Sequence, residues 1–426
     1  MYGMNDTQQL KDQAPFSHGV KRVLIFSLAY YPRFVGGAEL AIKEITDRID
    51  PSDIEFHMVT LRFDSTLPRV ERIGNVLVHR IGFARPDPSI VDLNTYPLRL
   101  NKHIFQFLAA LKALSLHHRY RYSGIWAMMA HSSGIPAVLF NMLRPRVPYL
   151  LTLQEGDTLE KIEKMMAPFW PLFQSAFRRA DVVQTISTFL ARWATRRGFR
   201  GLPKVVPNGV DVERFSRAYP SAEIDELENS LRKEIGDIFL ITTSRLVRKN
   251  AVDVIIQALV LLPEHVKCII VGTGPDERSL KLLAEELGVS GRVRFVGAVP
   301  HDDIPKYLQA SDIFIRPSRS EGMGNSFVEA FAAGVPVIAT QEGGIADFLF
   351  DAKRNPDVPT TGWAVDADSP EQVADAVNKI IGDPEKVREV TAKAQALAAQ
   401  KYDWDIVARS MRDEVFASLF ERGTTR

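Results

Sequence analysis

Short apolar runs alternate along the chain with longer segments in which apolar residues recur every three or four positions. A short apolar run predicts a buried strand, and the longer spacing predicts a helix with one apolar face. In the first half of the chain the predicted strands are 22–28, 54–60, 76–81, 124–128, 148–153, 181–185 and 204–206. The helices predicted between them are 38–49, 97–118, 133–142, 167–179 and 188–197.

A second alternating series begins at residue 238, and residues 213–237, which carry no strand signal, are interpreted as the linker. Its predicted strands are 238–243, 267–271, 293–296, 312–316, 335–339 and 362–365. Its predicted helices are 251–262, 276–287, 302–310 and 325–333, followed by three that start near Pro370, Pro384 and Asp403. Such alternation indicates parallel sheets that are covered by helices on both faces.

The pattern therefore predicts two tandem doubly wound, Rossmann-like α/β domains that face a cleft. The predicted boundaries are a polar leader over 1–20, an N-terminal domain over 21–206, a C-terminal domain over 207–400 and a final segment over 401–426. Ligands of open parallel sheets bind beyond the carboxyl ends of the strands. Functional residues are therefore expected in the loops that directly follow strands.

Composition places the chain in the ordinary globular class, with 46% hydrophobic and 25% charged residues among 426. The single cysteine, Cys268, rules out a disulfide within the chain and a cysteine metal cluster, which fits a reducing compartment. Residues 1–18 are polar and lack the apolar core of a signal peptide. Since no segment approaches the ~18 uninterrupted apolar residues of a spanning helix, we expect a cytoplasmic protein.

Charge is distributed unevenly although the formal net charge is only +1. Residues 1–206 carry 27 Lys and Arg against 17 Asp and Glu, whereas residues 207–426 carry 26 against 35. A basic first half suggests an anionic partner, such as a phosphorylated acceptor or an acidic membrane surface. An ordinary solvated surface is the alternative. Six arginines cluster around two predicted helices and favour reversible contact with anionic lipid: Arg178, Arg179, Arg192, Arg196, Arg197 and Arg200.

The loop after predicted strand 312–316 carries the strongest candidate site. Its glycines allow a ligand to approach the backbone, and the free N–H groups at the start of the next helix favour a phosphate. Glu321, before the glycines, can accept hydrogen bonds from sugar hydroxyls, and Glu329, one turn into the helix, can accept them from a ribose. The remaining candidate donor-binding residues here are Gly322, Met323, Gly324, Asn325 and Ser326.

Two further loops of the second domain carry candidate groups. Arg245 and Lys249 follow predicted strand 238–243, where cations can neutralise a departing diphosphate. Arginine can bind two phosphate oxygens at once, whereas lysine acts as a point charge. Gly272, in a Gly-Thr-Gly-Pro turn after the next strand, is a weaker candidate for donor binding, since a plain turn explains it equally well.

The first domain adds candidates in three loops. Gly36 and Gly37 open the first helix and offer backbone donors to a diphosphate or an acceptor. His131 follows predicted strand 124–128 at a position where a site is expected. Glu155 and Asp157 follow strand 148–153 and are candidates for holding an acceptor hydroxyl, although surface acids would give the same pattern.

Together these motifs resemble the family 4 glycosyltransferases, which have the GT-B fold. The resemblance covers nearly the whole chain after the leader. It rests on Gly36-Gly37-Ala38-Glu39, on Pro207-Asn208-Gly209-Val210-Asp211, on Ser244-Arg245-Leu246-Val247, on Glu321 and Glu329 with seven residues between them, and on the stretch from Phe331 to Gly344.

The resemblance implies a retaining, metal-independent transfer from a nucleotide sugar. In that family the residues that match Arg245 and a nearby lysine hold the diphosphate, and the one that matches Glu329 binds ribose. The residue that matches Glu321 contacts the sugar, and the histidine that matches His131 lies beside it. The resemblance also implies that the first domain is the acceptor side, that the second binds the nucleotide sugar, and that the last helix crosses back onto the first domain.

One departure from the family pattern concerns the diphosphate loop. The family often has Arg-Leu-x-x-x-Lys-Gly there, but this chain has Asn250 and Ala251 at the last two positions. Lys249 comes one residue earlier, and either Lys249 or Arg248 is the candidate phosphate ligand.

Other enzyme classes fit the sequence less well. A dinucleotide-dependent dehydrogenase would need Gly-x-Gly-x-x-Gly after the first strand, where this chain has Ala29-Tyr30-Tyr31-Pro32. A metal-dependent transferase would need an Asp-x-Asp pair after a strand. The pairs here, Asp366 with Asp368 and Asp403 with Asp405, fall at predicted helix starts and are interpreted as caps. Residues 29–37 offer no His, Asp or Glu as a base for an inverting reaction.

The expected partners are a UDP- or GDP-sugar as substrate and a glycan or lipid-linked acceptor, with no bound cofactor, no metal and no nucleic acid. The nucleotide, the sugar and the acceptor stay open. A nucleotide-sugar epimerase of the same fold and a non-catalytic nucleotide-sugar binding protein are the alternatives.

Overall fold

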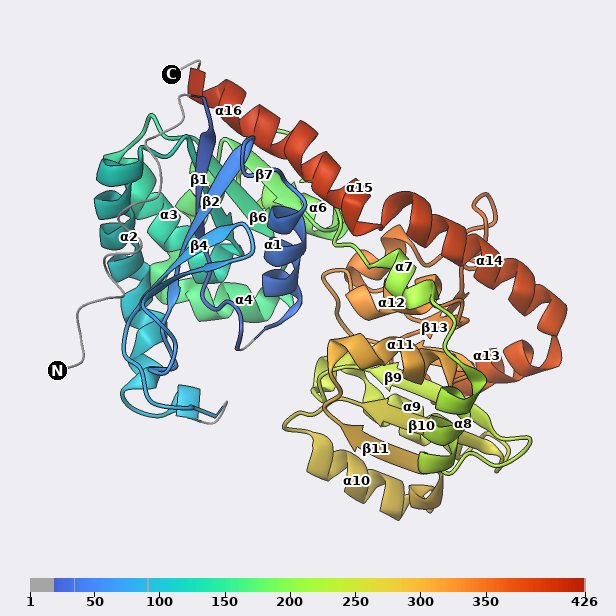
Figure 1. The fold of residues 1–426 in the computed structure, drawn as a ribbon. Helices are drawn as coiled ribbons and strands as arrows, with labels where there is room; N and C mark the ends of the chain where they lie inside the picture. The colour runs from blue at the N-terminus through green and yellow to red at the C-terminus, as the bar shows by residue number, and fades with distance from the viewer. Residues whose placement is uncertain (1–18, 34, 90–91, 425–426) are drawn as a thin grey trace.

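A computed structural model describes residues 19–33, 35–89 and 92–424 of the chain. Figure 1 shows two α/β domains, each built around one sheet. The strands of the first sheet lie in the order β3-β4-β2-β1-β5-β6-β7-β8, and β3 pairs antiparallel with β4 while the other neighbours are parallel. Their bounds are Lys21–Phe26 (β1), Ile54–Leu61 (β2), Val70–Ile73 (β3), Val76–Ile81 (β4), Gly124–Met128 (β5), Tyr149–Leu153 (β6), Val182–Thr185 (β7) and Lys204–Val205 (β8).

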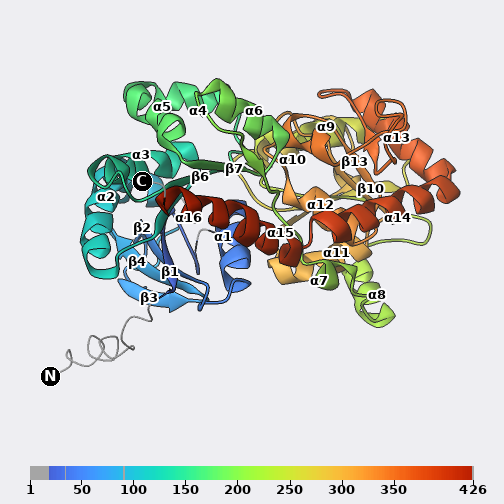
Figure 2. The same cartoon turned by 90° about the horizontal axis from the view of Figure 1, so that it is seen from above.

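Helices cover both faces of this first sheet because its strands are apolar on both sides. Leu24 and Phe26 of β1 join a core that includes the second, third, fifth and sixth helices, whereas Val23 and Ile25 pack toward α1 and the C-terminal helix. The helices of the first domain are Gly37–Asp47 (α1), Asn101–Tyr120 (α2), Ala130–Leu143 (α3), Leu159–Met166 (α4), Trp170–Arg179 (α5) and Thr188–Arg196 (α6). In Figure 2, α2, α3 and α5 lie to one side of these strands and α1 to the other.

The second sheet is parallel throughout and has the order β11-β10-β9-β12-β13-β14. Its strands are Ile238–Thr243 (β9), Val266–Val271 (β10), Val293–Gly297 (β11), Ile313–Arg316 (β12), Val337–Ala339 (β13) and Trp363–Ala364 (β14). Its helices are Val212–Ser216 (α7), Ser221–Ser230 (α8), Val252–Leu259 (α9), Glu277–Glu286 (α10), Ile304–Gln309 (α11), Asn325–Ala332 (α12), Pro370–Gly382 (α13) and Pro384–Lys401 (α14).

The end of the chain returns to the first domain as one long helical segment (Figures 1 and 2). It comprises Trp404–Ser410 (α15), a π-helical stretch Met411–Phe416 (η8) and Ala417–Thr424 (α16). The Phe416 ring lies 5.3 Å from that of Trp126 in β5 and 5.5 Å from that of Phe56 in β2. The expected crossing of the last helix onto the first domain is therefore confirmed.

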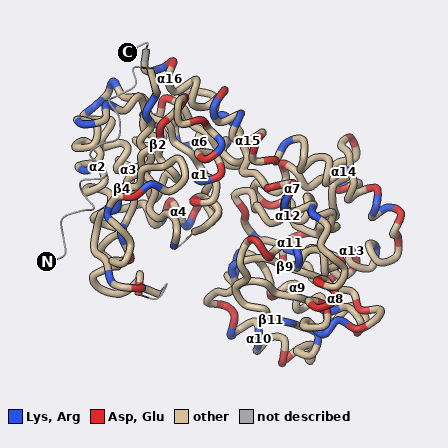
Figure 3. The backbone as a smooth tube through the Cα atoms, viewed as in Figure 1, with Lys and Arg blue, Asp and Glu red and all other residues tan. Residues whose placement is uncertain are grey.

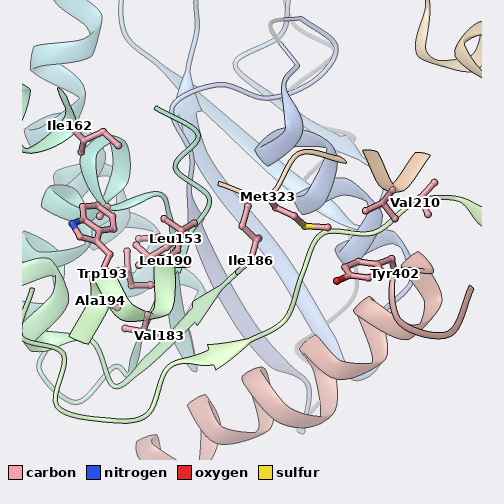
Figure 4. Packing of buried hydrophobic residues seen from close by; sticks show 14 of the residues in the cluster. Leu153, Ile162, Val183, Ile186, Leu190, Trp193, Ala194, Val210, Met323 and Tyr402 are labelled. Atoms are coloured by element: carbon pink, nitrogen blue, oxygen red, sulfur yellow. The ribbon is translucent and has the colours of Figure 1, made fainter. Parts of the chain in front are cut away.

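The chain passes between the domains twice, and the two crossings run side by side. The Val210 N–H donates to the Tyr402 carbonyl at 2.7 Å, and the Trp404 N–H donates to the Val210 carbonyl at 3.2 Å. Gly209 allows this contact, since a Cβ there would lie 2.7 Å from the Trp404 ring. Both crossings continue the apolar core, which runs from β6 and α6 through Ile186 to Met323, Val210 and Tyr402 (Figure 4).

Most predicted elements are present within a few residues, and β4, β5 and β9 have the predicted bounds. Among the strands and α-helices of the described residues, four were not predicted: the edge strand β3, helix α4, and helices α7 and α8 in the predicted linker. Helix α3 begins at Ala130, three residues before its prediction, although Gly134 and Pro136 lie inside it. The presumed polar leader falls almost wholly on residues 1–18, outside the described part of the chain. Among the described residues, no helix is both long and apolar enough to span a bilayer.

Candidate functional site

The carboxyl ends of the two sheets face each other, and the loops that follow the strands meet there. A Cβ on Gly322, in the loop after β12, would lie 2.3 Å from the carbonyl oxygen of Glu155, in the loop after β6. A Cβ on Gly37, at the start of α1, would lie 3.8 Å from Nδ2 of Asn325, at the start of α12. The structure thus brings the candidate loops of both domains together in one cleft.

Glu321 is the centre of a charged cluster in the second domain and is only 7% exposed. Its Oε1 lies 3.1 Å from the Arg316 guanidinium and accepts a hydrogen bond from Ser318 Oγ at 3.3 Å. Its Oε2 lies 3.6 Å from Nζ of Lys249. A carboxylate held between two cations and a hydroxyl keeps a fixed orientation. Such a group is suited to accept hydrogen bonds from a polyhydroxylated ligand.

Arg316 was not among the predicted site residues, although it is an isolated cation at the end of an apolar strand. Its guanidinium is buried, stacks on the Phe327 ring at 4.2 Å and donates to Ser326 Oγ at 2.7 Å and to the Thr243 carbonyl at 3.1 Å. Burial lowers the pKa of Arg316, while Glu321 and Glu329 act in the opposite direction. Arg316 therefore connects Glu321 to the first turn of α12.

Lys249 lies in a single 3-10 turn, Arg248–Asn250 (η4), and reaches into the cleft. Its Nζ donates to the Gly156 carbonyl of the first domain at 2.8 Å. The side chains of Arg248 and Arg245 are exposed at this loop. Ala251 ends the turn with φ 53°, a left-handed conformation at the position where the family has glycine. The departure from the family pattern therefore still places a lysine ammonium beside Glu321.

Arg319 fixes the turn that carries Lys249 against the loop that carries Glu321. Its backbone N–H donates to the Lys249 carbonyl at 2.7 Å, and its Nη1 donates to the Arg248 carbonyl at 2.6 Å. The guanidinium also binds both carboxylate oxygens of Asp253, at 3.0 and 2.6 Å. Sequence reasoning missed this residue because its partners lie 49 to 71 positions away in the chain.

The glycines after β10 support the neighbouring loop. A Cβ on Gly272 would lie 1.9 Å from the Ser244 carbonyl oxygen, and one on Gly274 would lie 2.1 Å from that of Leu246. The Leu246 N–H also donates to the Thr273 carbonyl at 3.0 Å. The turn therefore packs directly under the loop of Arg245, which accounts for both glycines as structural residues.

The start of α12 presents backbone donors to the cleft. Gly324 precedes it with φ 91°, and a Cβ there would lie 2.5 Å from the Phe327 ring and 2.8 Å from the Arg316 guanidinium. Asn325 and Ser326 are half-buried in the first turn, whereas the Met323 side chain is buried in the core between the domains (Figure 4). The backbone rather than the side chain of Met323 is therefore the part available to a ligand.

Glu329, one turn into α12, is 7% exposed and already has a partner. His301 Nε2 lies 2.9 Å from Glu329 Oε1, and the Arg214 guanidinium donates to Nδ1 of the same ring at 3.1 Å. The hydrogen bond to Glu329 raises the pKa of His301, and Arg214 opposes that rise. Because Oε1 faces His301, Oε2 is the oxygen turned away from that ring. Neither His301 nor Arg214 was predicted from the sequence.

His131 and Glu155 meet on the first-domain side of the cleft. His131 Nδ1 lies 3.5 Å from Glu155 Oε1, and the same oxygen accepts a hydrogen bond from the Ala130 N–H at 2.7 Å. Glu155 is 1% exposed, and its Oε2 has no hydrogen-bond partner among the described residues. The structure separates Glu155 from Asp157, whose side chain is 51% exposed and pairs with Lys161 at 3.2 Å.

Gly36 and Gly37 lie at the N-terminus of α1, where Glu39 supplies half of a capping box. The Gly36 N–H donates to Glu39 Oε2 at 2.8 Å, so this helix start is partly satisfied by its own chain. Burial raises the pKa of Glu39. Gly36 and Gly37 therefore face the cleft at a helix N-terminus, as predicted, but the carboxylate of Glu39 already accepts one of the N–H groups.

Three side-chain amides form a ladder of hydrogen bonds that crosses the cleft. Gln154 and Asn208 exchange hydrogen bonds at 3.0 and 3.2 Å, and Asn208 Nδ2 also donates to Asn325 Oδ1 at 3.2 Å. The ladder joins the first domain, the crossing segment and the start of α12. Asn208 belongs to the Pro-Asn-Gly motif, and the structure explains its presence there by this bridging position.

The two aspartate pairs have different environments. Asp403 caps α15 by accepting from the Asp405 N–H, as predicted. The prediction is wrong for the other pair, because Ser369 caps α13 while Asp366 and Asp368 pair with Arg354 and Arg319. Within residues 19–33, 35–89 and 92–424, no group of three or more His, Cys, Asp or Glu side chains is placed to hold a metal ion.

Comparison with known proteins identifies the family. Residues 35–214 match the family model described as Glycosyltransferase Family 4, and residues 223–397 match the model described as Glycosyl transferases group 1. The chain belongs to the family 4 glycosyltransferases. The two matched regions cover most of the two domains and include every cleft residue described above.

Among curated relatives of this glycosyltransferase, two are informative. A GDP-mannose-dependent alpha-(1-6)-phosphatidylinositol monomannoside mannosyltransferase of Mycobacterium tuberculosis is 32% identical over 259 residues, which cover 57% of this chain and 64% of that protein. A D-inositol 3-phosphate glycosyltransferase of Corynebacterium jeikeium is 31% identical over 222 residues, which cover 49% and 50%. The matched regions thus span less than two thirds of either relative.

Solved structures share the GT-B fold across nearly the whole glycosyltransferase chain. HepE of Anabaena in complex with UDP and glucose superimposes with a TM-score of 0.73 at 21% identity, over 93% of this chain and 100% of that one. Sucrose-phosphate synthase of Thermosynechococcus elongatus gives a TM-score of 0.74 at 20% identity, over 94% and 99%. At these identities the likeness establishes the two-domain fold.

Proposed function

We propose that this protein is a retaining glycosyltransferase that moves a sugar from a nucleotide diphosphate sugar to a hydroxyl of a glycan or lipid-linked acceptor, without a metal ion. The observation that carries the proposal is the Lys249–Glu321 pair beside the N-terminus of α12. There a cation for the diphosphate and a carboxylate for the sugar lie 3.6 Å apart. Both residues lie in the cleft where the carboxyl ends of the two parallel sheets face each other. Open parallel α/β sheets bind their ligands at this end.

In the proposed reaction, positive charge develops on the sugar ring while negative charge develops on the leaving diphosphate. Arg245, Lys249 and the backbone N–H groups at the start of α12 stabilise that negative charge. Glu329 accepts from the ribose, and Glu321 accepts from hydroxyls of the transferred sugar. In a front-face reaction the leaving phosphate oxygen takes the acceptor proton, so the proposal needs no protein base.

His131 and Glu155 lie on the opposite wall from Glu321 and complete the proposed site. Because Glu155 Oε1 faces Nδ1 of the ring, Nε2 is the nitrogen turned away from that carboxylate. We propose that His131 contacts the donor sugar and that Glu155 orients the ring through Nδ1. The acceptor enters from the first-domain side, with Asp157 at the exposed edge of the same loop.

GDP-mannose is the donor we propose first. The supporting observation is that curated relatives at 29–32% identity are described as GDP-mannose-dependent, whereas the UDP-bound structural neighbour is 21% identical. A thermal-shift comparison of GDP, UDP, GDP-mannose and UDP-glucose tests this choice. A ligand present at a hundred times its dissociation constant stabilises the folded protein by about 2.7 kcal/mol, which gives a clear shift.

Product analysis by NMR tests the reaction itself. With an α-linked donor sugar, the proposal expects an α-linked product, and it expects turnover to persist in EDTA. A β-linked product would contradict retention, and loss of turnover on chelation that Mn²⁺ or Mg²⁺ restores would contradict metal independence. Conversion of the donor sugar to an epimer without acceptor would identify an epimerase instead, and tight donor binding without any turnover would identify a binding protein.

The basic first half supports one more proposal, a reversible contact between the N-terminal domain and an anionic membrane surface. Exposed arginines attract acidic lipid with a strength that falls as salt increases. Co-sedimentation with acidic vesicles at rising salt tests this contact.

A further inference from the structure

A basic cavity of about 660 Å³ lies in the N-terminal domain. Its walls come from segments that precede strands β6, β7 and β8, so it opens at the amino edge of the sheet, opposite to the cleft. The five residues of β6 alone separate the two edges by about 17 Å at ~3.3 Å per residue. The cavity is therefore distinct from the proposed donor site.

Five arginines line this cavity together with a single carboxylate, Asp181, which accepts from the Tyr149 N–H at 2.9 Å. The arginines are Arg146, Arg178, Arg179, Arg200 and Arg422. Five guanidinium groups against one carboxylate leave an excess of positive charge in the lining, which a bound anion would offset. Figure 3 shows Lys and Arg along this end of the domain, close to the C-terminus.

Helix dipoles explain only part of this cluster. Helices α3, α5, α6 and α16 all end near the cavity, and cations are favoured within the last turn of a helix. Arg178, Arg179 and Arg422 lie in such last turns. Arg146 and Arg200 lie in loops three and four residues beyond the ends of α3 and α6, where the dipole effect has faded. Their position indicates a role other than helix capping.

Buried contacts hold the walls of the cavity in place. Asn141, which is 2% exposed, donates to the Val147 carbonyl at 3.1 Å and accepts from Arg179 Nε at 3.1 Å. Gly198 has φ 97°, and a Cβ there would lie 3.1 Å from Arg178 Nε, so the Arg178 side chain lies across this turn. At least two arginines are thus positioned by the fold.

Exposed apolar side chains flank the cavity. Met142 and Leu143, at the end of α3, are 55% and 58% exposed, and Leu202, next to the lining residue Gly201, is 92% exposed. In addition, residues 93–154, which include α2 and α3, contain no Asp or Glu. Arginines beside exposed aliphatic side chains match a lipid surface, which offers phosphates and an apolar layer just beneath them.

We propose that this cavity binds the phosphate of an anionic phospholipid head group and seats the N-terminal domain on the membrane, with Met142, Leu143 and Leu202 entering the lipid. The proposal deepens the membrane contact proposed above. It also changes which arginines are proposed to contact the membrane. Arg178, Arg179 and Arg200 line the cavity, whereas Arg197 lies 3.4 Å from Glu163 and stacks on Trp170.

A pair of charge-reversed variants of the full chain tests the cavity. Arg178→Glu with Arg200→Glu alters the lining, and Arg192→Glu with Arg196→Glu makes the same charge change on exposed residues of α6 outside the lining. Co-sedimentation uses vesicles of phosphatidylglycerol in phosphatidylcholine, and of phosphatidylcholine alone. At about 1 kcal/mol for each basic residue near the surface, the cavity variant loses about 30-fold or more in binding, and the control keeps most of it.

Two further measurements separate lipid from free phosphate. Leu202→Ser is expected to weaken vesicle binding several-fold, while stabilisation by inorganic phosphate in a thermal-shift assay stays that of the wild type. Equal losses in both charge-reversed variants, or unchanged binding in the cavity variant, would overturn the proposal. Phosphate binding without vesicle binding would assign the cavity to a soluble anion instead.

Two controls show whether the cavity variant still folds and still binds the donor nucleotide. Thermal unfolding verifies its fold, and if it unfolds, the single change Arg200→Gln, expected to give a several-fold loss, replaces it. Calorimetry with the donor nucleotide is expected to give unchanged affinity, because the altered residues lie at the opposite edge of the sheet. Failure of the donor assay in the wild type would therefore contradict the proposed function and leave the membrane result unaffected.

Discussion

Lys249 contacts both domains through a single ammonium group. Its Nζ donates to the Gly156 carbonyl of the first domain and lies 3.6 Å from Glu321 Oε2 of the second. Arg248, the neighbouring cation, has an exposed side chain, and its carbonyl is bound by Arg319. The two adjacent residues therefore have opposite roles in the turn, one facing the cleft and the other facing solvent.

This difference predicts unequal effects of two substitutions. Lys249→Ala removes the charge that would meet the departing diphosphate, and turnover is expected to fall by at least ~100-fold, the usual scale for such a contact. Arg248→Ala removes a solvated charge and is expected to cost less than about tenfold. Steady-state kinetics with saturating donor measure both. A larger loss of turnover in Arg248→Ala than in Lys249→Ala would indicate that Arg248 is the phosphate ligand.

A second residue-scale prediction concerns His79, which is buried in β4 at 4% exposure. Burial lowers its pKa to about 3, and the nearby His57, Lys112 and Arg119 act in the same direction. Because the folded pKa lies below the unfolded value of about 6.5, the unfolded chain binds the proton first. Stability is then lost as pH falls from about 6.5 toward 3, at up to about 1.4 kcal/mol per pH unit.

The variant His79→Leu is expected to flatten that acid dependence, since leucine does not titrate. Unfolding midpoints at pH 7, 6 and 5 give the slope. His103→Leu, on the exposed face of α2, is the matched control and is expected to keep the wild-type slope. An unchanged slope in His79→Leu would assign the acid sensitivity to other groups, among them the buried His57.

At the scale of elements, the two loops after β9 and β12 form one unit because Arg319 joins them. Arg319 binds Asp253 through both carboxylate oxygens, Asp368 at 2.6 Å and the carbonyl of Arg248. These contacts hold the turn of Lys249 at a fixed distance from Glu321. Arg319 is thus a positioning residue for the proposed site.

Arg319→Lys is expected to lower turnover about tenfold, since a lysine cannot reproduce bidentate contacts to a carboxylate and a carbonyl. The unfolding midpoint is expected to change little, because the guanidinium lies at the surface end of the loop with 20% exposure. Asp368→Ala, which removes a partner that is 62% exposed, is the milder control. Equal turnover in all three proteins would show that the turn holds its position without Arg319.

Which elements were predictable follows from where their stabilisation comes from. Strands β5 and β9 are buried along most of their length, so their apolar runs predict where they begin and end. The edge strand β3 is partly exposed on all four residues, and α8 has no buried residue, so neither carries a clear pattern. The positions of β3 and α8 therefore depend on contacts with other elements of the fold rather than on an apolar pattern of their own.

The same distinction applies to the site. Arg245, Glu321 and Glu329 follow strands within one domain, so local spacing was sufficient to name them as candidates. The roles of His301 and Asn208 depend on distant residues, because Glu329 lies 28 positions from His301 and Asn325 lies 117 positions from Asn208. An arginine at the end of an otherwise apolar strand was the one local signal that would have pointed to Arg316.

At the scale of the whole molecule, the two domains touch through two neighbouring sets of loops. In one, Lys249 and Gly322 meet the loop of Glu155 and Gly156. In the other, Asp347 of the second domain accepts from the Thr188 N–H at 2.7 Å and from the Thr188 hydroxyl. Asp347 thereby adds a negative charge at the N-terminus of α6, where the helix dipole favours it.

This contact predicts how the arrangement of the domains responds to substitution. Asp347→Ala removes two charge-assisted hydrogen bonds, each worth about 1.5–3 kcal/mol at most, from the arrangement in which the loops meet. If only that arrangement binds the donor, the apparent affinity falls in proportion to its population. We expect a larger radius of gyration in solution scattering without nucleotide, and donor affinity weakened by up to about tenfold.

The control variant Asp375→Ala, on the exposed face of α13, is expected to keep the wild-type radius of gyration and donor affinity. Unchanged scattering together with unchanged affinity in Asp347→Ala would mean that the crossings at Val210 and Tyr402 hold the domains together without this contact.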